Sequence, residues 1–449
     1  MTGAIRERRA RNVLFVMTDQ QSADAIGSLV PGGFLETPNL DRLIGEGVRF
    51  TRAYTPNPLC APARASVFTG RYPHEHGIQT NDDAHPTPFA CLGRRFADAG
   101  FRTGYYGKWH LPWDAADTDT HGFAEIDNVA SANGADPRTP GLATDFLRRD
   151  TQQPFLLVAS FNNPHNVCEW ARGDRDMPDG SIGPVPPIDR LPPALSNDAP
   201  PIDEPDIVAA VRRSMHAHPL FPVGGFGQRD WRELIWAYYR MIEHVDRGIG
   251  VVLDALRDSG RADETLVVFT SDHGDCRGAH AFNQKTVFYE ESSRVPLIVR
   301  GPGVAAGAVD DRLVNIGVDM MPTMLAAAGV PNDADLPGRD LFDDALPPRD
   351  CVVCENHAVQ TVEVYGWRPT PRGRMVRSDR FKYCLYDQGE RRESLVDLLD
   401  DPGETVNLAP RPEMADVVAQ HRRMLGAFAE VHGDDTAAAM LASRGSGTG

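Results

Sequence analysis

Residues 12–20 read NVLFVMTDQ, an apolar run that ends at Thr18 and is followed at once by Asp19 and Gln20. A short, continuously apolar run of this kind is typical of a strand buried on both faces. Further strands are expected at residues 48–54, 101–106, 155–161, 265–270 and 296–299, and helices at residues 37–46, 91–99, 231–256 and 318–328. Strands that alternate with helices predict an α/β fold, with a mostly parallel or mixed central sheet and helices on both faces.

Polar residues follow three of these strands directly, in the segments 18–20, 106–110 and 271–275. In sheets of this class, ligands bind at the carboxyl ends of the strands. We therefore expect the three polar segments to meet in one site at that edge of the sheet.

The chain has 449 residues, which is enough for one large domain and a smaller one. From about residue 350 the pattern changes to short strand-like runs, at 373–378 and 381–387, and a closing helix at 412–432. We predict a main domain at residues 1–349, a smaller antiparallel α+β subdomain at 350–442 and a disordered tail at 443–449.

Residues 167–227 are rich in proline, glycine and aspartate and have little periodicity. A segment of this kind predicts a long excursion over the surface, which often shapes a substrate site. Trp170 and Arg172 in this segment, together with Trp367, are therefore candidates for the wall of the site.

The composition argues against several kinds of partner and location. A formal net charge of −17 opposes nucleic-acid binding, which depends on a basic surface. No apolar stretch approaches the roughly 18 residues of a membrane span, and the five-residue run at 13–17 is too short for the core of an export signal. The seven cysteines have no disulfide-framework spacing. We therefore expect a reduced, cytoplasmic protein that binds neither nucleic acid nor membrane, and no pattern indicates an oligomeric state.

Only three of the 46 basic residues are lysines: Lys108, Lys285 and Lys382. The rest are arginines. A lysine retained in such a background suggests a task that the planar fork of arginine performs badly, such as a point contact with one oxygen of a tetrahedral anion. Two of the three lysines lie in the motifs described next.

The segment Cys60-Ala61-Pro62-Ala63-Arg64 is followed shortly by Thr69-Gly70-Arg71. This spacing resembles the signature of the type I sulfatases of the alkaline-phosphatase superfamily, in which many members have Ser or Thr where this chain has Ala63. The resemblance implies an alkaline-phosphatase-like fold and conversion of Cys60 to formylglycine by a formylglycine-generating enzyme. One hydroxyl of the formylglycine hydrate attacks sulfur, and the second then expels sulfate, so that one difficult step becomes two easier ones.

The same resemblance implies a divalent cation held by Asp19, Gln20, Asp272 and His273. Many members have a second aspartate where this chain has Gln20, and the variation also occurs in choline-sulfatase-like and phosphonate-monoesterase-like relatives. Hard oxygen ligands favour Ca²⁺ or Mg²⁺, and the histidine also suits Mn²⁺. We expect Ca²⁺, which would orient the nucleophile and neutralise charge on the sulfate oxygens.

The remaining site residues also come from the resemblance. In the motif Gly107-Lys108-Trp109-His110 the lysine contacts sulfate and the histidine assists elimination. Three further positions complete the pocket: Lys285 binds sulfate, His165 protonates the departing oxygen, and Asn81 faces the leaving group or the metal shell. Arg64 would join the two lysines and the cation in stabilising charge on the anion.

These residues together predict a hydrolase that releases inorganic sulfate from a small-molecule or glycan sulfate ester, most naturally a sulfated carbohydrate, with its catalytic sulfatase domain at residues 1–349. Two alternatives stay open. A phosphonate monoester or phosphodiester hydrolase of the same superfamily is compatible with Gln20, but such relatives generally lack Lys108 and His110. A non-catalytic binding protein would keep Cys60 as a thiol.

Overall fold

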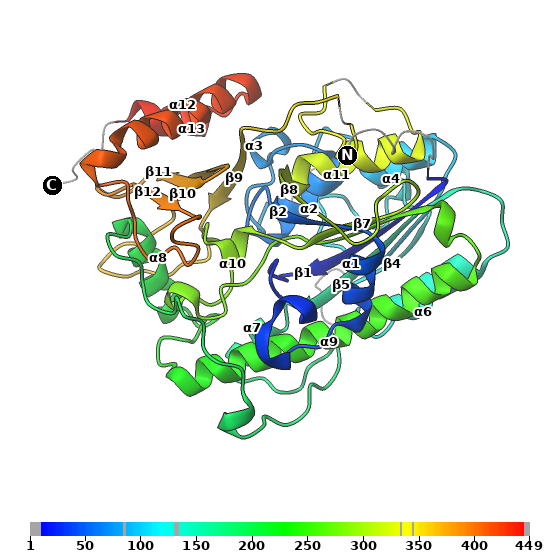
Figure 1. The fold of residues 1–449 in the computed structure, drawn as a ribbon, viewed down its shortest axis with the longest axis horizontal. Helices are drawn as coiled ribbons and strands as arrows, with labels where there is room; N and C mark the ends of the chain where they lie inside the picture. The colour runs from blue at the N-terminus through cyan, green and yellow to red at the C-terminus, as the bar shows by residue number, and fades with distance from the viewer. Residues whose placement is uncertain (1–9, 84–86, 130–133, 333–334, 344, 444–449) are drawn as a thin grey trace.

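The computed structural model describes residues 10–83, 87–129, 134–332, 335–343 and 345–443 (Figure 1). All but the first residue of the predicted tail at 443–449 therefore lies outside the described residues. The chain forms an eight-stranded sheet and a separate four-stranded sheet, with helices packed against both. This arrangement confirms the predicted α/β architecture with a smaller antiparallel part toward the C-terminus.

The large sheet has the strand order β4-β3-β5-β1-β6-β7-β2-β8. Its strands are β1 (Asn12–Asp19), β2 (Val48–Tyr54), β3 (Arg102–Lys108), β4 (Glu125–Val129), β5 (Phe155–Pro164), β6 (Thr265–Ser271), β7 (Leu297–Arg300) and β8 (Ala308–Asn315). Every pairing is parallel except the two that β7 makes with β6 and β2. The two strands at the sheet edges, β4 and β8, were not predicted, because they carry charged residues where a buried strand has an apolar run.

Helices cover both faces of this sheet, as the alternation of strands and helices predicts (Figure 1). The helices that precede the smaller sheet in the chain are α1 (Pro38–Glu46), α2 (Cys60–Thr69), α3 (Pro73–His76), α4 (Leu92–Asp98), α5 (Thr118–His121), α6 (Thr139–Arg148), α7 (Val167–Ala171), α8 (Asp206–Ala217), α9 (Gln228–Asp258), α10 (Glu290–Ser293) and α11 (Ile316–Ala328). Short 3₁₀ helices lie at Gly27–Leu29, Pro31–Gly33, Ile188–Arg190, Ala262–Glu264, Ala279–Ala281 and Pro412–Met414.

Successive side chains of β1 enter two different hydrophobic cores, as expected for a strand covered on both faces. Phe15 packs in one core with residues of α2, α4 and α11, and Val16 packs in the other with residues of α1, α6 and α9. The central strands are thus held rigidly from both sides, which fixes the polar residues at their carboxyl ends.

The smaller sheet is antiparallel, in the order β12-β11-β10-β9. Its elements are β9 (Cys351–His357), β10 (Arg372–Ser378), β11 (Phe381–Tyr386), β12 (Glu393–Asp397), α12 (Ala415–His432) and α13 (Asp435–Ala442). Helices α12 and α13 pack against one face and α8 against the other. The segment 167–227 contains α8, and α8 buries its apolar face against the smaller sheet. The segment is therefore not only a surface excursion. Within the described residues, no helix combines the length and apolar character that crossing a membrane requires.

A buried ion pair links α3 to β9 of the smaller sheet. His74 Nδ1 lies 2.6 Å from an Oε1 of Glu355, and both side chains are less than a tenth exposed. Burial alone would lower the pKa of His74, but its hydrogen bond to Glu355 and the charges of Glu355 and Asp434 raise that pKa to about 9.

This ion pair predicts a pH-dependent stability. Because the pKa of His74 is higher in the folded chain than the ordinary 6.5, the stabilisation is complete below pH 6.5 and disappears as the pH rises to 9. We expect His74→Gln to cost more at pH 6 than at pH 9.5, by ~3 kcal/mol. Urea unfolding of both proteins at the two pH values measures this difference, and an equal cost at both would contradict it.

Candidate active site

Four neighbouring strands of the large sheet, β3, β5, β1 and β6, bring the predicted residues together at their carboxyl ends. Thr18 of β1 pairs with Ser271 of β6, so Asp19 and Asp272, which follow them, lie side by side. On the other side, Asp19 is in register with Pro164 of β5, the residue before His165. Sheet register therefore explains why segments far apart in the sequence form one site.

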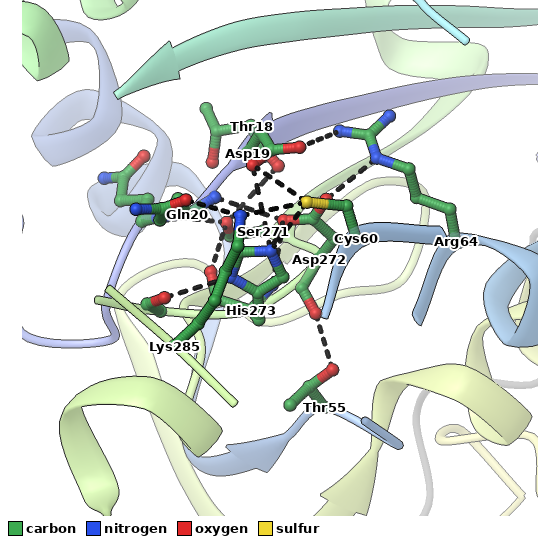
Figure 2. Close-up of polar contacts among 12 residues, drawn as sticks. Thr18, Asp19, Gln20, Thr55, Cys60, Arg64, Ser271, Asp272, His273 and Lys285 are labelled. Atoms are coloured by element: carbon green, nitrogen blue, oxygen red, sulfur yellow. Dashed lines mark hydrogen bonds and ion pairs between the residues drawn. The ribbon is translucent and has the colours of Figure 1, made fainter. Parts of the chain in front are cut away.

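Cys60 is the first residue of α2, a helix that is buried along its whole length. Its sulfur lies 3.0 Å from Lys285 Nζ, 3.2 Å from His273 Nε2 and 3.7 Å from Asp19 Oδ1 (Figure 2). Asn81 Oδ1 accepts the backbone N–H of Ala61 at 3.0 Å, so the predicted site residue Asn81 holds the first turn of the helix. Cys60 thus stands at the centre of the site.

The surroundings of Cys60 favour negative charge at its side chain. Burial raises the pKa of the thiol, but the charges of Lys285, Lys108 and His273 outweigh it and hold the pKa well below its usual range. His110 and His165 also interact with the thiol, and the pKa of His165 is lowered by burial and by the two lysines. The site is therefore a buried cluster in which cationic groups surround one side chain.

Arg64 faces the two carboxylates rather than open space (Figure 2). Its Nε donates to Asp272 Oδ2 at 2.8 Å, and one terminal nitrogen lies 3.3 Å from Asp19 Oδ2. The other terminal nitrogen donates to Ser160 Oγ and to the carbonyl of Lys108, at 2.9 and 3.1 Å. Arg64 therefore orients the two carboxylates, and its expected part in stabilising charge on the anion stays a prediction.

The same carboxylates show opposite pKa shifts. Burial and Cys60 raise the pKa of Asp19, but Lys108, whose Nζ lies 2.5 Å from Oδ2, and the nearby His165 and Lys285 lower it below its usual range. Burial and the charge of Asp19 raise the pKa of Asp272 to about 6, against the opposing effects of His273 and Arg64.

One ligand atom each of Asp19, Cys60, Asp272 and His273 lies within 4.8 Å of the others. The Nδ1 of His273 faces the Gly274 carbonyl at 3.0 Å, which leaves its Nε2 directed at this group. Carboxylate oxygens and an imidazole nitrogen form a donor set that suits a divalent cation. The predicted metal residues therefore fit such an ion.

Gln20 adjoins the same group, with its side chain fixed at both ends. Its Oε1 accepts from Lys285 Nζ at 2.6 Å, and its Nε2 donates to Asp275 Oδ2 at 2.5 Å. The backbone of Gln20 has a positive φ of 75°, and its N–H donates to Asp272 Oδ1 at 3.1 Å. Asp275 lies in the predicted polar segment 271–275 but was not assigned a role, although its carboxylate sets which way the Gln20 amide points.

Lys108 reaches the site because Gly107 lets β3 approach β5 closely. Gly107 has a φ of 107°, and a Cβ at this position would lie 1.9 Å from the Ser160 carbonyl oxygen. Only glycine fits such an approach. The glycine of the motif therefore has a structural function, which places the lysine after it beside Asp19.

The three candidate wall residues behave differently. Trp170 is buried, with its ring packed against Trp236 and covered by Arg175, and its place in the wall of the site stays a prediction. Arg172 pairs with Glu169 near the surface. Trp367 is 42% exposed.

The sequence and fold were compared with those of known proteins. The Sulfatase family model matches residues 11–330, and a model of the C-terminal part of N-sulphoglucosamine sulphohydrolase matches residues 278–430. The chain is 30% identical to the sulfatase YidJ of Escherichia coli K12, over 90% of this chain and 84% of that protein. It is 29% identical to a Delta 4,5-hexuronate-2-O-sulfatase of Bacteroides thetaiotaomicron, over 96% of this chain and 91% of that protein.

Solved structures give the same result. A 2-O GAG sulfatase superimposes with a TM-score of 0.79 at 25% identity, covering 96% of this chain and 94% of its own. A phosphonate monoester hydrolase of Agrobacterium radiobacter superimposes with a TM-score of 0.71 at 24% identity, covering 94% and 96%. The second likeness is one of fold.

Proposed function

Because the chain belongs to the type I sulfatase family and is an enzyme that hydrolyses sulfate esters, we propose that Cys60, oxidised to formylglycine, is its nucleophile and that a divalent cation assists it. The observation that carries this proposal is the position of the Cys60 sulfur, 3.0 Å from Lys285 Nζ and 3.2 Å from His273 Nε2. A side chain placed there at a helix start, among cations, suits attack on a sulfate group.

Each surrounding residue has a role in this proposal. Lys108 and Lys285 bind the sulfate oxygens and stabilise the charge that builds up on them. His165 donates a proton to the departing oxygen, for which its interaction with Cys60 places it suitably. His110 takes the proton from the hydroxyl that expels sulfate. Arg64 holds Asp19 and Asp272 in place.

The cation is assigned to Asp19, Gln20, Asp272 and His273, and Ca²⁺ is the ion expected from the mainly oxygen donors, with Mg²⁺ and Mn²⁺ as alternatives. When bound, it supplies positive charge to the sulfate and lowers the pKa of the attacking hydroxyl. We assign this chemistry to residues 1–349 and the smaller subdomain to residues 350–442.

The proposed substrate is a sulfated carbohydrate. This rests on the relatives: one is a hexuronate 2-O-sulfatase, another an N-acetylglucosamine-6-O-sulfatase, and a further solved relative binds D-glucosamine-2-N,6-O-disulfate. Choline and aryl sulfatases are also among the relatives. Within the superfamily, Gln20 leaves phosphonate monoesters as a second candidate, whereas Lys108 and His110 favour sulfate.

The test combines maturation with turnover. The enzyme is expressed with and without a formylglycine-generating enzyme, and mass spectrometry of the Cys60 peptide measures its conversion to aldehyde. Inorganic sulfate released from sugar, aryl and choline sulfates is then compared with phosphonate release from phenyl phosphonate esters. Sulfate release in proportion to the aldehyde supports the proposal, and activity of the unconverted thiol form would overturn it.

Metal content gives a separate prediction. We expect Asp272→Ala to weaken Ca²⁺ binding at least about a hundredfold, because a carboxylate ligand contributes more than the outer residues whose loss costs about 10–100-fold. Metal analysis after dialysis measures this without reference to activity. Asp379→Ala, at an exposed carboxylate paired with Arg52, is the control and should retain the metal. Full retention by Asp272→Ala would remove it from the metal site.

A further inference from the structure

We propose that Asn356, in strand β9 of the smaller sheet, is a positioning residue that fixes the ammonium group of Lys285 in the active site. The inference rests on the proposed sulfate-binding role of Lys285. It gives the smaller sheet a function in catalysis, because Asn356 belongs to that sheet and contacts Thr286, the residue after Lys285.

Lys285 lies in a loop whose backbone is strained on both sides. Gln284 has a φ of 66° and Thr286 a φ of 73°. A β-branched residue such as threonine rarely adopts this left-handed conformation. A backbone of this kind persists only when its surroundings hold it in place, and such strain is concentrated at functional sites.

Three hydrogen bonds hold this loop. The carbonyl of Gln284 accepts from the N–H of Cys276 at 2.7 Å, and the N–H of Thr286 donates to the carbonyl of Pro58 at 3.0 Å. The carbonyl of Thr286 accepts from Asn356 Nδ2 at 2.8 Å. The first two are backbone contacts that many sequences could make. The third depends on the identity of one side chain.

Asn356 is itself fixed relative to the nucleophile. It is 5% exposed, so water does not replace its contact with Thr286. The preceding residue, Glu355, donates its backbone N–H to Pro56 at 2.8 Å, in the loop that leads to Cys60. Strand β9 therefore contacts the loop before the nucleophile and the loop of the lysine at adjacent residues.

The neighbouring strand leaves space for this amide. Gly373 of β10 is in register with Asn356, and a Cβ on Gly373 would lie 2.6 Å from Asn356 Oδ1 and also 2.7 and 3.0 Å from ring carbons of Phe288 and Tyr386. A larger residue at 373 would push the amide away from Thr286. Gly373 therefore belongs to the same arrangement, and it offers a second way to disturb it.

The Asn356 contact matters because the ammonium group of Lys285 makes short contacts in the site. Lys285 Nζ lies 3.0 Å from Cys60 Sγ and 2.6 Å from Gln20 Oε1. A shift of about 1 Å in the backbone that carries a catalytic group is enough to lower turnover about a hundredfold. Release of the Thr286 carbonyl allows such a shift.

The decisive variant is Asn356→Asp, which keeps the shape of the side chain and replaces the donor by an acceptor. We expect kcat/KM for a sulfate ester to fall 10- to 100-fold, and the inhibition constant of inorganic sulfate to rise. Gly373→Ala, with Asn356 intact, should change both in the same direction. It serves as the second variant if Asn356→Asp does not fold.

Asn315→Asp is the matched control. Asn315 Nδ2 also donates to a β9 carbonyl, that of Val353, at 2.9 Å, and an aspartate can still accept the N–H of Gly317 through which Asn315 begins α11. It loses one buried donor to the same strand without touching the lysine loop. We expect it to lower the melting temperature and to leave kcat/KM and sulfate inhibition unchanged.

A double-variant cycle separates positioning from a general loss of stability. With Lys285→Met as the second change, Asn356→Asp should cause little further loss in kcat/KM, because the group it positions is gone. Independent, additive losses would overturn the inference while the role of Lys285 stands. If Lys285→Met alone retains full turnover, the proposed role of Lys285 fails instead.

Discussion

Cys60→Ala should abolish sulfate release, with kcat reduced by about 10⁴-fold or more, as expected when a covalent nucleophile is removed. The sulfur of Cys60 is the atom on which Lys285 and His273 converge, and alanine leaves these groups without a reacting partner. The measurement is release of inorganic sulfate by protein whose wild-type form is shown by mass spectrometry to carry the aldehyde.

The fold should survive this change, since the removed atom packs among polar groups rather than in a hydrophobic core. The control is Cys91→Ala. Cys91 is also fully buried, but it lies in the hydrophobic core beside α4. We expect Cys91→Ala to lower stability by about 1 kcal/mol and to leave turnover of the folded enzyme unchanged. Residual activity of Cys60→Ala close to that of the wild type would remove Cys60 from the mechanism.

The sequence predicted the centre of the site well because sheet geometry is simple. Asp19 and Asp272 each follow a buried apolar strand, and neighbouring parallel strands end at the same edge. Lys108 ends a third strand, β3, and His110 follows it. Their position near the two aspartates could therefore be predicted without knowing the loop structure. For these residues the hydrophobic pattern alone locates the backbone, and the polar residue type then indicates the chemistry.

Residues whose positions depend on tertiary contacts were harder to assign. The direction of the Arg64 side chain follows from the carboxylates that surround it in the folded chain, and these are not visible in the spacing of its motif. Asn356 was harder still to assign from the sequence. No motif surrounds it, and its contact with Thr286 arises only when the smaller sheet packs against the main domain. The burial of Trp170 was equally hidden, since a proline-rich segment gave no sign that α7 packs against α9.

The edge strands and α8 illustrate a second limit. β4 and β8 each have one unpaired side, so their sequences carry charged residues and lack the apolar run that identifies a central strand. Helix α8 lies between proline-rich stretches, and its apolar face becomes evident only when the smaller sheet that it covers is known. Local patterns therefore predicted the elements of the core better than those at its margins.

The three lysines provide the second large expected effect. All three are buried, yet they have different partners. Lys285 contacts Cys60, the proposed nucleophile, at 3.0 Å, and Lys108 contacts the adjacent carboxylate of Asp19 at 2.5 Å. Lys382, in the smaller subdomain, lies 2.5 Å from Glu404 of the same subdomain and 3.2 Å from Glu290 of α10. Burial and charge are matched among them, so their variants separate a catalytic from a structural lysine.

We expect Lys285→Met and Lys108→Met each to lower kcat/KM by about 10²–10³-fold, since each removes one preorganised positive group facing the charge that develops on the sulfate. Methionine keeps most of the side-chain volume, so packing is largely retained. Lys382→Met should instead destabilise the fold by about 3–5 kcal/mol, because it leaves the buried carboxylate of Glu404 without its ion-pair partner, while Glu290 keeps its ion pair with Arg294. In the folded fraction its kcat/KM should stay within about tenfold of the wild type, which corresponds to ~1.4 kcal/mol.

Sulfate release measured at low temperature, together with urea unfolding, distinguishes the two outcomes for every variant. A stability loss in Lys285→Met with unchanged turnover would place that lysine with Lys382 as a structural residue. The pocket would then rely on Lys108 and the cation to bind the anion. The opposite result, with large catalytic losses at both site lysines and not at Lys382, supports a contact between their ammonium groups and the reacting sulfate, because the burial of the three side chains is the same.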